Sequence, residues 1–180
     1  MAITIVATAG ASNANSFVTA AEMSSFCDAR LNAAIWTGAD AQLPALVMAT
    51  QELTLLDYIG TRVNSTQALA WPRDYAINPD APSVSILGDI ALLYFANTIV
   101  PQRIKDATCL LALEYLKAGT TDLSVVDPNV GVIEKTIDVI TTRWASASER
   151  PTGWKRFPLV LRLLDGLLAN QGGGLDMVRA

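Results

Sequence analysis

The chain contains no histidine and only two cysteines, and these absences exclude several kinds of chemical site. Cys27 and Cys109 lie in separate predicted helices and form no CxxC pair, so the usual ligand sets of a zinc site are missing. Without histidine there is no Ser–His or Cys–His nucleophile. We therefore expect two buried free thiols, no metal, no cofactor and no enzymatic activity.

Other sequence signs of a catalytic or nucleotide-binding site are also missing. The carboxylates of Asp57, Asp74, Asp80 and Asp89 are spread over predicted loops and helix ends, without the spacing of a paired acid–base site. The only glycine-rich stretch, residues 172–174, neither follows a predicted strand nor opens a helix, so it does not resemble a phosphate-binding loop.

Charged residues are scarce, at 17% of the chain, while apolar residues make up 51% and the mean hydropathy is +0.32. Soluble domains typically have about 25% charged and about 45–50% apolar residues. A membrane does not explain this composition. Residues 1–21 lack charge but are broken by Gly10 and a Ser/Asn cluster, and residues 90–102 are too short to span a bilayer. We expect instead that other subunits cover much of the surface.

Positive charge is both scarce and scattered. The net charge is −4, the pI is about 4.7, and Lys155-Arg156 is the only adjacent pair among the 13 basic residues. Because phosphate neutralisation supplies most non-specific affinity for nucleic acid, this balance argues against tight DNA binding. The same charge balance suits a protein that lines a channel through which DNA passes without binding tightly.

Hydrophobic periodicity predicts a mainly α fold: a bundle of about four helices with a small β-hairpin and extended N- and C-terminal arms. A capping box at Thr19 and Glu22, a cap at Asp40 and Pro101 mark three helix starts. The predicted helices cover residues 20–32, 40–59, 101–117 and 158–168. Residues 2–8 form an arm or an edge strand, and residues 132–144 form a hairpin or a long strand. Residues 1–170 form one predicted domain with an arm at 1–16, and residues 171–180 form a flexible tail behind Gly172–Gly174.

One motif, residues 67–73 (QALAWPR), separates a long helical pattern from a loop rich in Pro, Asn and Asp. Pro72 removes a donor and keeps Trp71 out of the helical region. One interpretation buries Trp71 in the core and pairs Arg73 with a carboxylate. The other makes the two residues an interface anchor.

A second candidate contact lies in the apolar stretch 86–98, which is either a short strand pair or the start of a helix. An apolar loop with no room in the core favours a subunit contact. The candidate interface residues are therefore Trp71, Arg73, Leu92, Leu93, Tyr94 and Phe95.

Three motifs in this order, Asn15–Val18, QALAWPR and residues 99–108 (IVPQRIKDAT), resemble a tailed-bacteriophage family. Its members are often labelled DnaT-like single-stranded-DNA-binding proteins, and structurally it is similar to head–tail connectors. The resemblance covers about residues 13–170. It implies a virion protein of the neck, assembled in the host cytoplasm. Such a protein forms a dodecameric ring between the portal protein and a downstream tail or neck protein. The ring lines the channel for double-stranded DNA, helps retain packaged DNA and does not bind it tightly.

The resemblance also implies that the tail docks on the portal, through Leu175, Asp176, Met177, Val178, Arg179 and Ala180. A disordered tail is the alternative. The alternative function is single-stranded-DNA binding, which uses aromatic rings stacked in a basic groove. Trp36, Trp71, Trp144 and Trp154 could supply such rings, but the chain as a whole is acidic.

Overall fold

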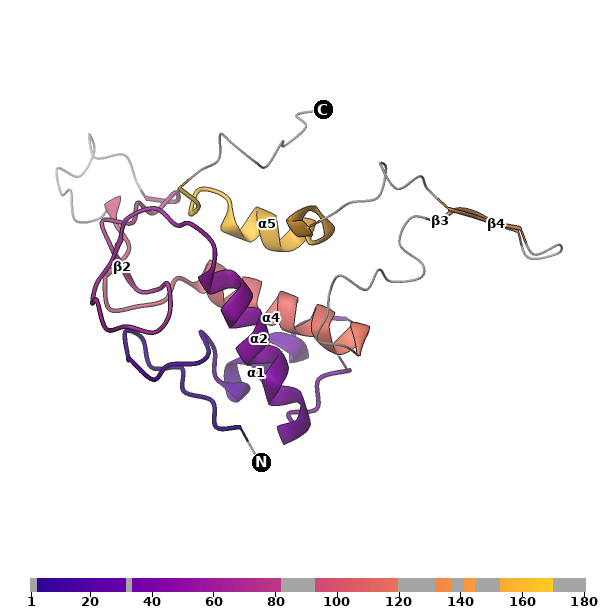
Figure 1. The fold of residues 1–180 in the computed structure, drawn as a ribbon, viewed down its shortest axis with the longest axis horizontal. Coiled ribbons are helices and arrows are strands. Elements are labelled where there is room, and N and C mark those ends of the chain that lie inside the picture. The colour runs from indigo at the N-terminus through magenta and orange to yellow at the C-terminus, as the bar shows by residue number, and fades with distance from the viewer. Residues whose placement is uncertain are drawn as a thin grey trace.

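The computed structural model has the predicted mainly α architecture (Figure 1) and describes residues 3–31, 34–81, 93–119, 132–136, 141–144 and 153–169. The helices are α1 (Ala20–Asp28), α2 (Leu43–Thr54), α4 (Gln102–Ala118) and α5 (Pro158–Leu164), with 3₁₀ turns η1 (Asp40–Gln42) and η3 (Gly153–Arg156). The strands form two small antiparallel pairs: β1 (Thr61–Arg62) with β2 (Arg73–Asp74), and β3 (Val132–Thr136) with β4 (Thr141–Trp144). The predicted hairpin at 132–144 is confirmed.

Helix α4 is at the centre of the core and packs against α1, α2 and α5. Its apolar side chains recur at helical spacing, and Ile104, Ala107 and Leu111 are at most 1% exposed. Leu46 and Leu53 of α2 are buried against the same core, as is Leu164 of α5. Burial of these stripes is the main force that holds the helices together.

Two predicted helix ends are confirmed in atomic detail. The Thr19 hydroxyl accepts from the Glu22 amide at 3.1 Å, and the Glu22 carboxylate accepts from the Thr19 amide at 2.7 Å, so the capping box is complete. At the other end of the core, Gly119 ends α4 with φ 63°, a left-handed conformation that favours glycine.

Other helix boundaries were wrong. Helix α1 ends at Asp28 instead of residue 32. Asp40 opens η1 and does not cap α2, which begins at Leu43 because Pro44 fits only in a first turn. The predicted continuation to residue 59 stops at Thr54, because the following backbone pairs elsewhere: Ile59 donates to the carbonyl of Leu167 at 3.0 Å.

The same pairing shortens the last helix. Helix α5 ends at Leu164, and Gly166, at φ 77°, turns the chain back. Ala169 then donates to the carbonyl of Asp57 at 2.9 Å, and Leu168 forms an isolated bridge with Tyr58. Residues 57–59 and 167–169, which the sequence predicts as two helix ends, therefore pair with each other through backbone hydrogen bonds.

Of the two interpretations of residues 2–8, the structure favours the arm, because the described residues 3–8 are irregular and form no strand. The Asn15 side chain accepts from the Val6 amide at 2.8 Å and donates to the Thr4 carbonyl at 2.9 Å. This satisfies the backbone without a partner strand. Ala68 also donates to the carbonyl of Ala11 at 3.2 Å, so this segment contacts its own domain.

Both cysteines are buried and free, as predicted. Burial raises the pKa of the Cys109 thiol to about 12 and also raises that of Cys27. Leu92, residues 82–91 and the tail 171–180 lie outside the described residues, so the predictions made for them stay predictions.

Candidate functional site

Trp71 is a core residue: its side chain is 1% exposed. Two aromatic rings meet it edge to face, Tyr58 at 5.6 Å and Phe95 at 5.9 Å between ring centroids. Its indole N–H has no hydrogen-bond acceptor among the described residues. The structure therefore favours the core interpretation of Trp71, and any effect on an interface would be indirect.

Arg73 is held by backbone carbonyls, and among the described residues it has no ion pair with the carboxylate that the core interpretation assigns to it. Its Nε donates to Ile59 at 2.8 Å and its Nη1 donates to Ala70 at 3.2 Å. Its Nη2 donates to Tyr58 at 3.1 Å and to Gly60 at 2.7 Å. We call this arrangement the Arg73 cage. Burial, and secondly repulsion from Arg62, lower the pKa of Arg73.

The cage joins the chain after α2 to the strand β2, and two further residues make it possible. Gly60 has φ 75°, and a Cβ there would lie 2.4 Å from the carbonyl oxygen of Asp74, so only glycine fits. Gln67 is 3% exposed, and its Nε2 donates to the carbonyls of Leu69 and Pro72 at 2.8 and 3.0 Å. The motif QALAWPR thus stabilises its own turn.

An aromatic pair lies at the surface beside this core. Tyr75 is 75% exposed, and its ring meets that of Tyr94 edge to face at 6.1 Å. Tyr75 has φ 57°, a region that a bulky side chain rarely adopts. Ile77, which is 54% exposed, forms an antiparallel bridge with Tyr94. In the described part of 86–98, residues 93–98, the chain thus forms a single bridge at Tyr94 and neither a strand pair nor a helix of several turns.

Most described basic side chains have partners within the chain. Lys105 pairs with Glu22 at 2.5 Å, Lys117 pairs with Glu114 at 2.7 Å, and Arg103 pairs with Asp80 at 2.6 Å. Arg73 is in its cage, and Arg30 and Arg156 lie over the rings of Phe26 and Phe157. The three ion pairs reduce the positive field that a phosphate backbone would meet.

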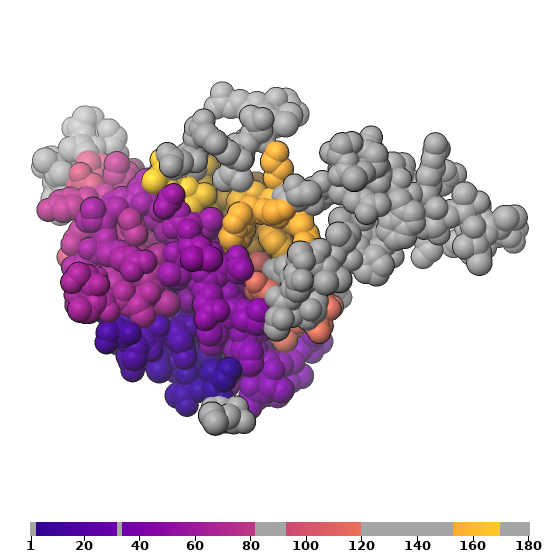
Figure 2. Space-filling model, viewed as in Figure 1, coloured from indigo at the N-terminus to yellow at the C-terminus, as the bar shows by residue number. Residues whose placement is uncertain are grey.

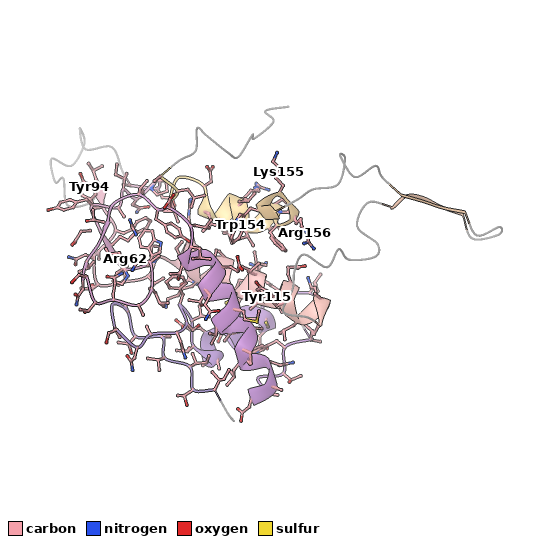
Figure 3. All side chains as sticks on the ribbon, in the orientation of Figure 1. Arg62, Tyr94, Tyr115, Trp154, Lys155 and Arg156 are labelled. Atoms are coloured by element: carbon pink, nitrogen blue, oxygen red, sulfur yellow. The ribbon has the colours of Figure 1, made fainter. Side chains whose placement is uncertain are left out.

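The tryptophans offer few stacking surfaces for bases. Trp36 is 7% exposed, and its Nε1 donates to Ser24 Oγ at 3.0 Å. Trp71 is in the core, whereas Trp154 is half-buried next to Lys155 and Arg156 (Figure 3). Among the tryptophan side chains that the structure describes, Trp154 is therefore the one with a ring near the surface and basic neighbours.

The described residues hold no cluster of three or more His, Cys, Asp or Glu side chains suited to a metal ion. Within the same residues, no helix has the length and apolar character needed to cross a membrane.

The structure brings two sequence candidates, Trp71 and Phe95, into contact and pairs the ring of Tyr94 with that of Tyr75. Arg73 is separate from these ring contacts, in its cage of carbonyls. Sequence reasoning missed Tyr58, whose ring contacts Trp71 and whose hydroxyl donates to the Leu53 carbonyl at 2.8 Å. A tyrosine at a predicted helix end gives no local signal of this contact.

Sequence reasoning also missed Tyr75, since its positive φ leaves no mark in the sequence. Leu93 is half-buried, and its carbonyl accepts from the Asn78 amide at 2.8 Å.

A family described as "Putative DnaT-like ssDNA binding protein" matches residues 1–180 of the chain. No curated protein and no solved structure matches the chain.

Proposed function

The chain belongs to the DnaT-like ssDNA-binding protein family, and we propose that it acts as a structural subunit of a homo-oligomer, a head–tail connector of a tailed bacteriophage. The motifs Asn15–Val18, QALAWPR and residues 99–108 support this assignment because they resemble a tailed-bacteriophage family that is structurally similar to head–tail connectors. The proposal includes no catalytic step, metal or cofactor.

The observation that carries the proposal is the apolar surface of the described chain. Leu31, Leu55 and Tyr75 are 95%, 80% and 75% exposed, in a protein with only 17% charged residues. Further large apolar side chains, Leu159, Ile77 and Ile99, are 50–58% exposed. Single exposed leucines are common, but many of them with so little charge favour surfaces that other subunits cover.

In the proposed assembly, twelve copies form a ring in the virion neck, after synthesis in the host cytoplasm. The ring binds the portal protein on one side and a downstream tail or neck protein on the other. Double-stranded DNA passes through it and is not held tightly, since the net charge is −4. Leu175 to Ala180 dock on the portal, where symmetry multiplies a weak contact.

Single-stranded-DNA binding is the second candidate function, and the family description favours it directly. The structural observation in its favour is the half-buried ring of Trp154 next to Lys155 and Arg156. Against it, Lys105, Lys117 and Arg103 are paired with carboxylates.

Fluorescence anisotropy with a labelled oligo(dT) strand separates the two functions. We expect Kd above about 1 µM at physiological salt, because few free cations are available to release counterions. Tighter binding with a steep salt dependence, lost in Trp154→Ala but kept in Trp36→Ala, would favour the DNA-binding function.

A chain truncated after Gly174 should fold normally and fail to bind portal rings. Normal portal binding by that chain would show that the tail is not the contact.

A further inference from the structure

An open groove of about 530 Å³ lies where α4, α5 and the residues after α1 meet. Three arginines and three leucines line it: Arg30, Arg103, Arg162, Leu110, Leu159 and Leu163. Residues 153–169, coloured orange to yellow in Figure 2, form part of the molecular surface on this side of α4. The groove therefore combines an apolar lining with positive charge in an acidic protein.

Two of the three guanidinium groups form no ion pair with a described carboxylate, although Arg30 lies over the Phe26 ring at 4.0 Å from its centroid. Arg103 donates to both carboxylate oxygens of Asp80, at 2.6 and 2.8 Å, and so is fixed in place. Arg30 and Arg162 are exposed, and neither forms an ion pair with a described carboxylate. Asp165 also lines the groove, so an incoming carboxylate would meet two cations beside one anion.

The lining favours a peptide over a nucleic acid. No aromatic side chain of the described residues lines the groove, so bases would find no ring on which to stack. Leu159, at 58% exposure, and the half-buried Leu110 and Leu163 offer instead an apolar contact that phosphates cannot use. A fitting occupant carries apolar side chains with carboxylates beside them.

We propose that this groove binds residues 122–127 of a second copy of the chain, Asp-Leu-Ser-Val-Val-Asp. The surrounding sequence, residues 118–134, contains Asp122, Asp127 and Glu134 but no lysine or arginine. Its charge is therefore complementary to that of the groove. In an extended conformation Leu123, Val125 and Asp127 project to the same side, so two apolar groups and a carboxylate face the groove together.

This inference rests on the proposed function. In the proposed homo-oligomer, each copy inserts its segment into the groove of one neighbour, and its own groove binds the segment of the other neighbour. Such a head-to-tail contact closes into a ring if the rotation between copies closes. Each contact is small, but the closed ring repeats it around the axis.

Charge reversal tests the contact. The groove variant Arg30→Glu/Arg162→Glu and the segment variant Asp122→Arg/Asp127→Arg are each compared with wild type by sedimentation velocity. Each variant should weaken assembly by at least about tenfold, because like charges then face each other. The combined variant, with both pairs reversed, should recover assembly. Arg62→Glu, an exposed arginine on β1 outside the groove, is the matched control and should assemble as wild type does.

Mixing the two reversed variants sharpens the test. The wild-type segment of the groove variant fits the wild-type groove of the segment variant, and the reversed segment fits the reversed groove. An equimolar mixture should therefore recover assembly, with the two variants alternating around the ring, although neither variant assembles alone. Thermal melts of the segment variant should stay at the wild-type midpoint. The groove variant should melt only slightly earlier, because Arg162 is exposed and Arg30 loses only its contact with the Phe26 ring.

Four outcomes would overturn the inference. If wild type and both variants all form rings, the groove is not the contact, and the proposed function stands. If the variants melt earlier but assemble normally, the segment binds within its own chain. If they assemble normally but no longer bind portal rings, the groove takes a portal segment. A wild type that stays monomeric at every concentration and does not bind portal rings removes both this inference and the proposed function.

Discussion

Arg73 and Arg162 show two different uses of a guanidinium group in one small protein. Arg73 is enclosed by four backbone carbonyls next to the buried ring of Trp71, and its bonds join two segments of the chain. Arg162 lies on α5, exposed, beside the leucines of an open groove. The first contributes to folding, whereas the second is available to a partner.

The contrast between the two arginines separates the residues that build the fold from those available to a partner. The motif QALAWPR is the most distinctive stretch in the sequence, yet the structure uses it to build the core and the turn after α2. Exposed apolar side chains and the groove arginines carry less sequence signal, and they provide the surface on which the proposed assembly depends.

The largest expected effect on stability comes from Trp71, in the buried region next to Arg73. Trp71→Ala should lower the free energy of unfolding by about 3–5 kcal/mol, because it removes a fully buried ring and leaves a cavity between Tyr58 and Phe95. Chemical denaturation measures this loss. Trp154→Ala, at a half-buried site, should cost less than about 2 kcal/mol. A Trp71 variant that melts normally and fails to assemble would make Trp71 an interface anchor after all.

Gly60→Ala should come next, at more than about 2 kcal/mol, since the added Cβ meets backbone atoms and the φ of 75° disfavours a side chain. Gly119→Ala is the matched control. It also has a positive φ, 63°, but no atom lies within 4 Å of its new Cβ, so it should cost only about 1–2 kcal/mol. Equal losses in denaturation curves would show that the close packing around Gly60 adds nothing.

The two arginines can be compared directly. Arg73→Lys should cost about 1–3 kcal/mol, because a single ammonium cannot satisfy carbonyls on both sides of the cage. Arg162→Lys should change the free energy of unfolding by less than about 0.5 kcal/mol. Equal small effects in paired urea melts would mean that the cage is not a stabilising feature.

The smallest effect concerns the pair between α1 and α4. Burial disfavours the Glu22 carboxylate, but hydrogen bonds from Lys105 and Thr19 outweigh it and lower the pKa of Glu22 below its ordinary 4.5. The ionised group therefore stabilises the fold at pH values above 4.5, and this stabilisation is lost as the pH falls through the folded-state pKa.

Glu22→Gln keeps the capping box but removes the charge. Wild type should therefore be more stable than the variant at neutral pH, and the difference should vanish at acidic pH. A difference in melting temperature that does not change with pH would contradict this account of Glu22.

Local sequence signals predicted the parts of the fold that depend on neighbours in the chain. The capping box at Thr19, the end of α4 at Gly119 and the β3–β4 hairpin are of this kind. The early ends of α2 and α5 were not predictable, because residues 57–59 pair with residues 167–169 across a long sequence separation.

The candidate site shows the same limit. Burial of Trp71 could be expected from its size and type, but the partners of Arg73 could not. Backbone carbonyls are present at every residue, so the sequence does not show which of them will gather around a guanidinium. The contact between the rings of Tyr75 and Tyr94 likewise joins residues distant in sequence, and no local pattern marks it.

Sedimentation velocity of the full chain with oligo(dT), followed by protein and by nucleic-acid absorbance, tests the central claim most directly. The proposed function predicts a closed homo-oligomer that sediments without nucleic acid, because apolar surfaces associate while the net charge of −4 repels phosphates. A monomer that carries the oligonucleotide with it would contradict the assembly function and support the DNA-binding one.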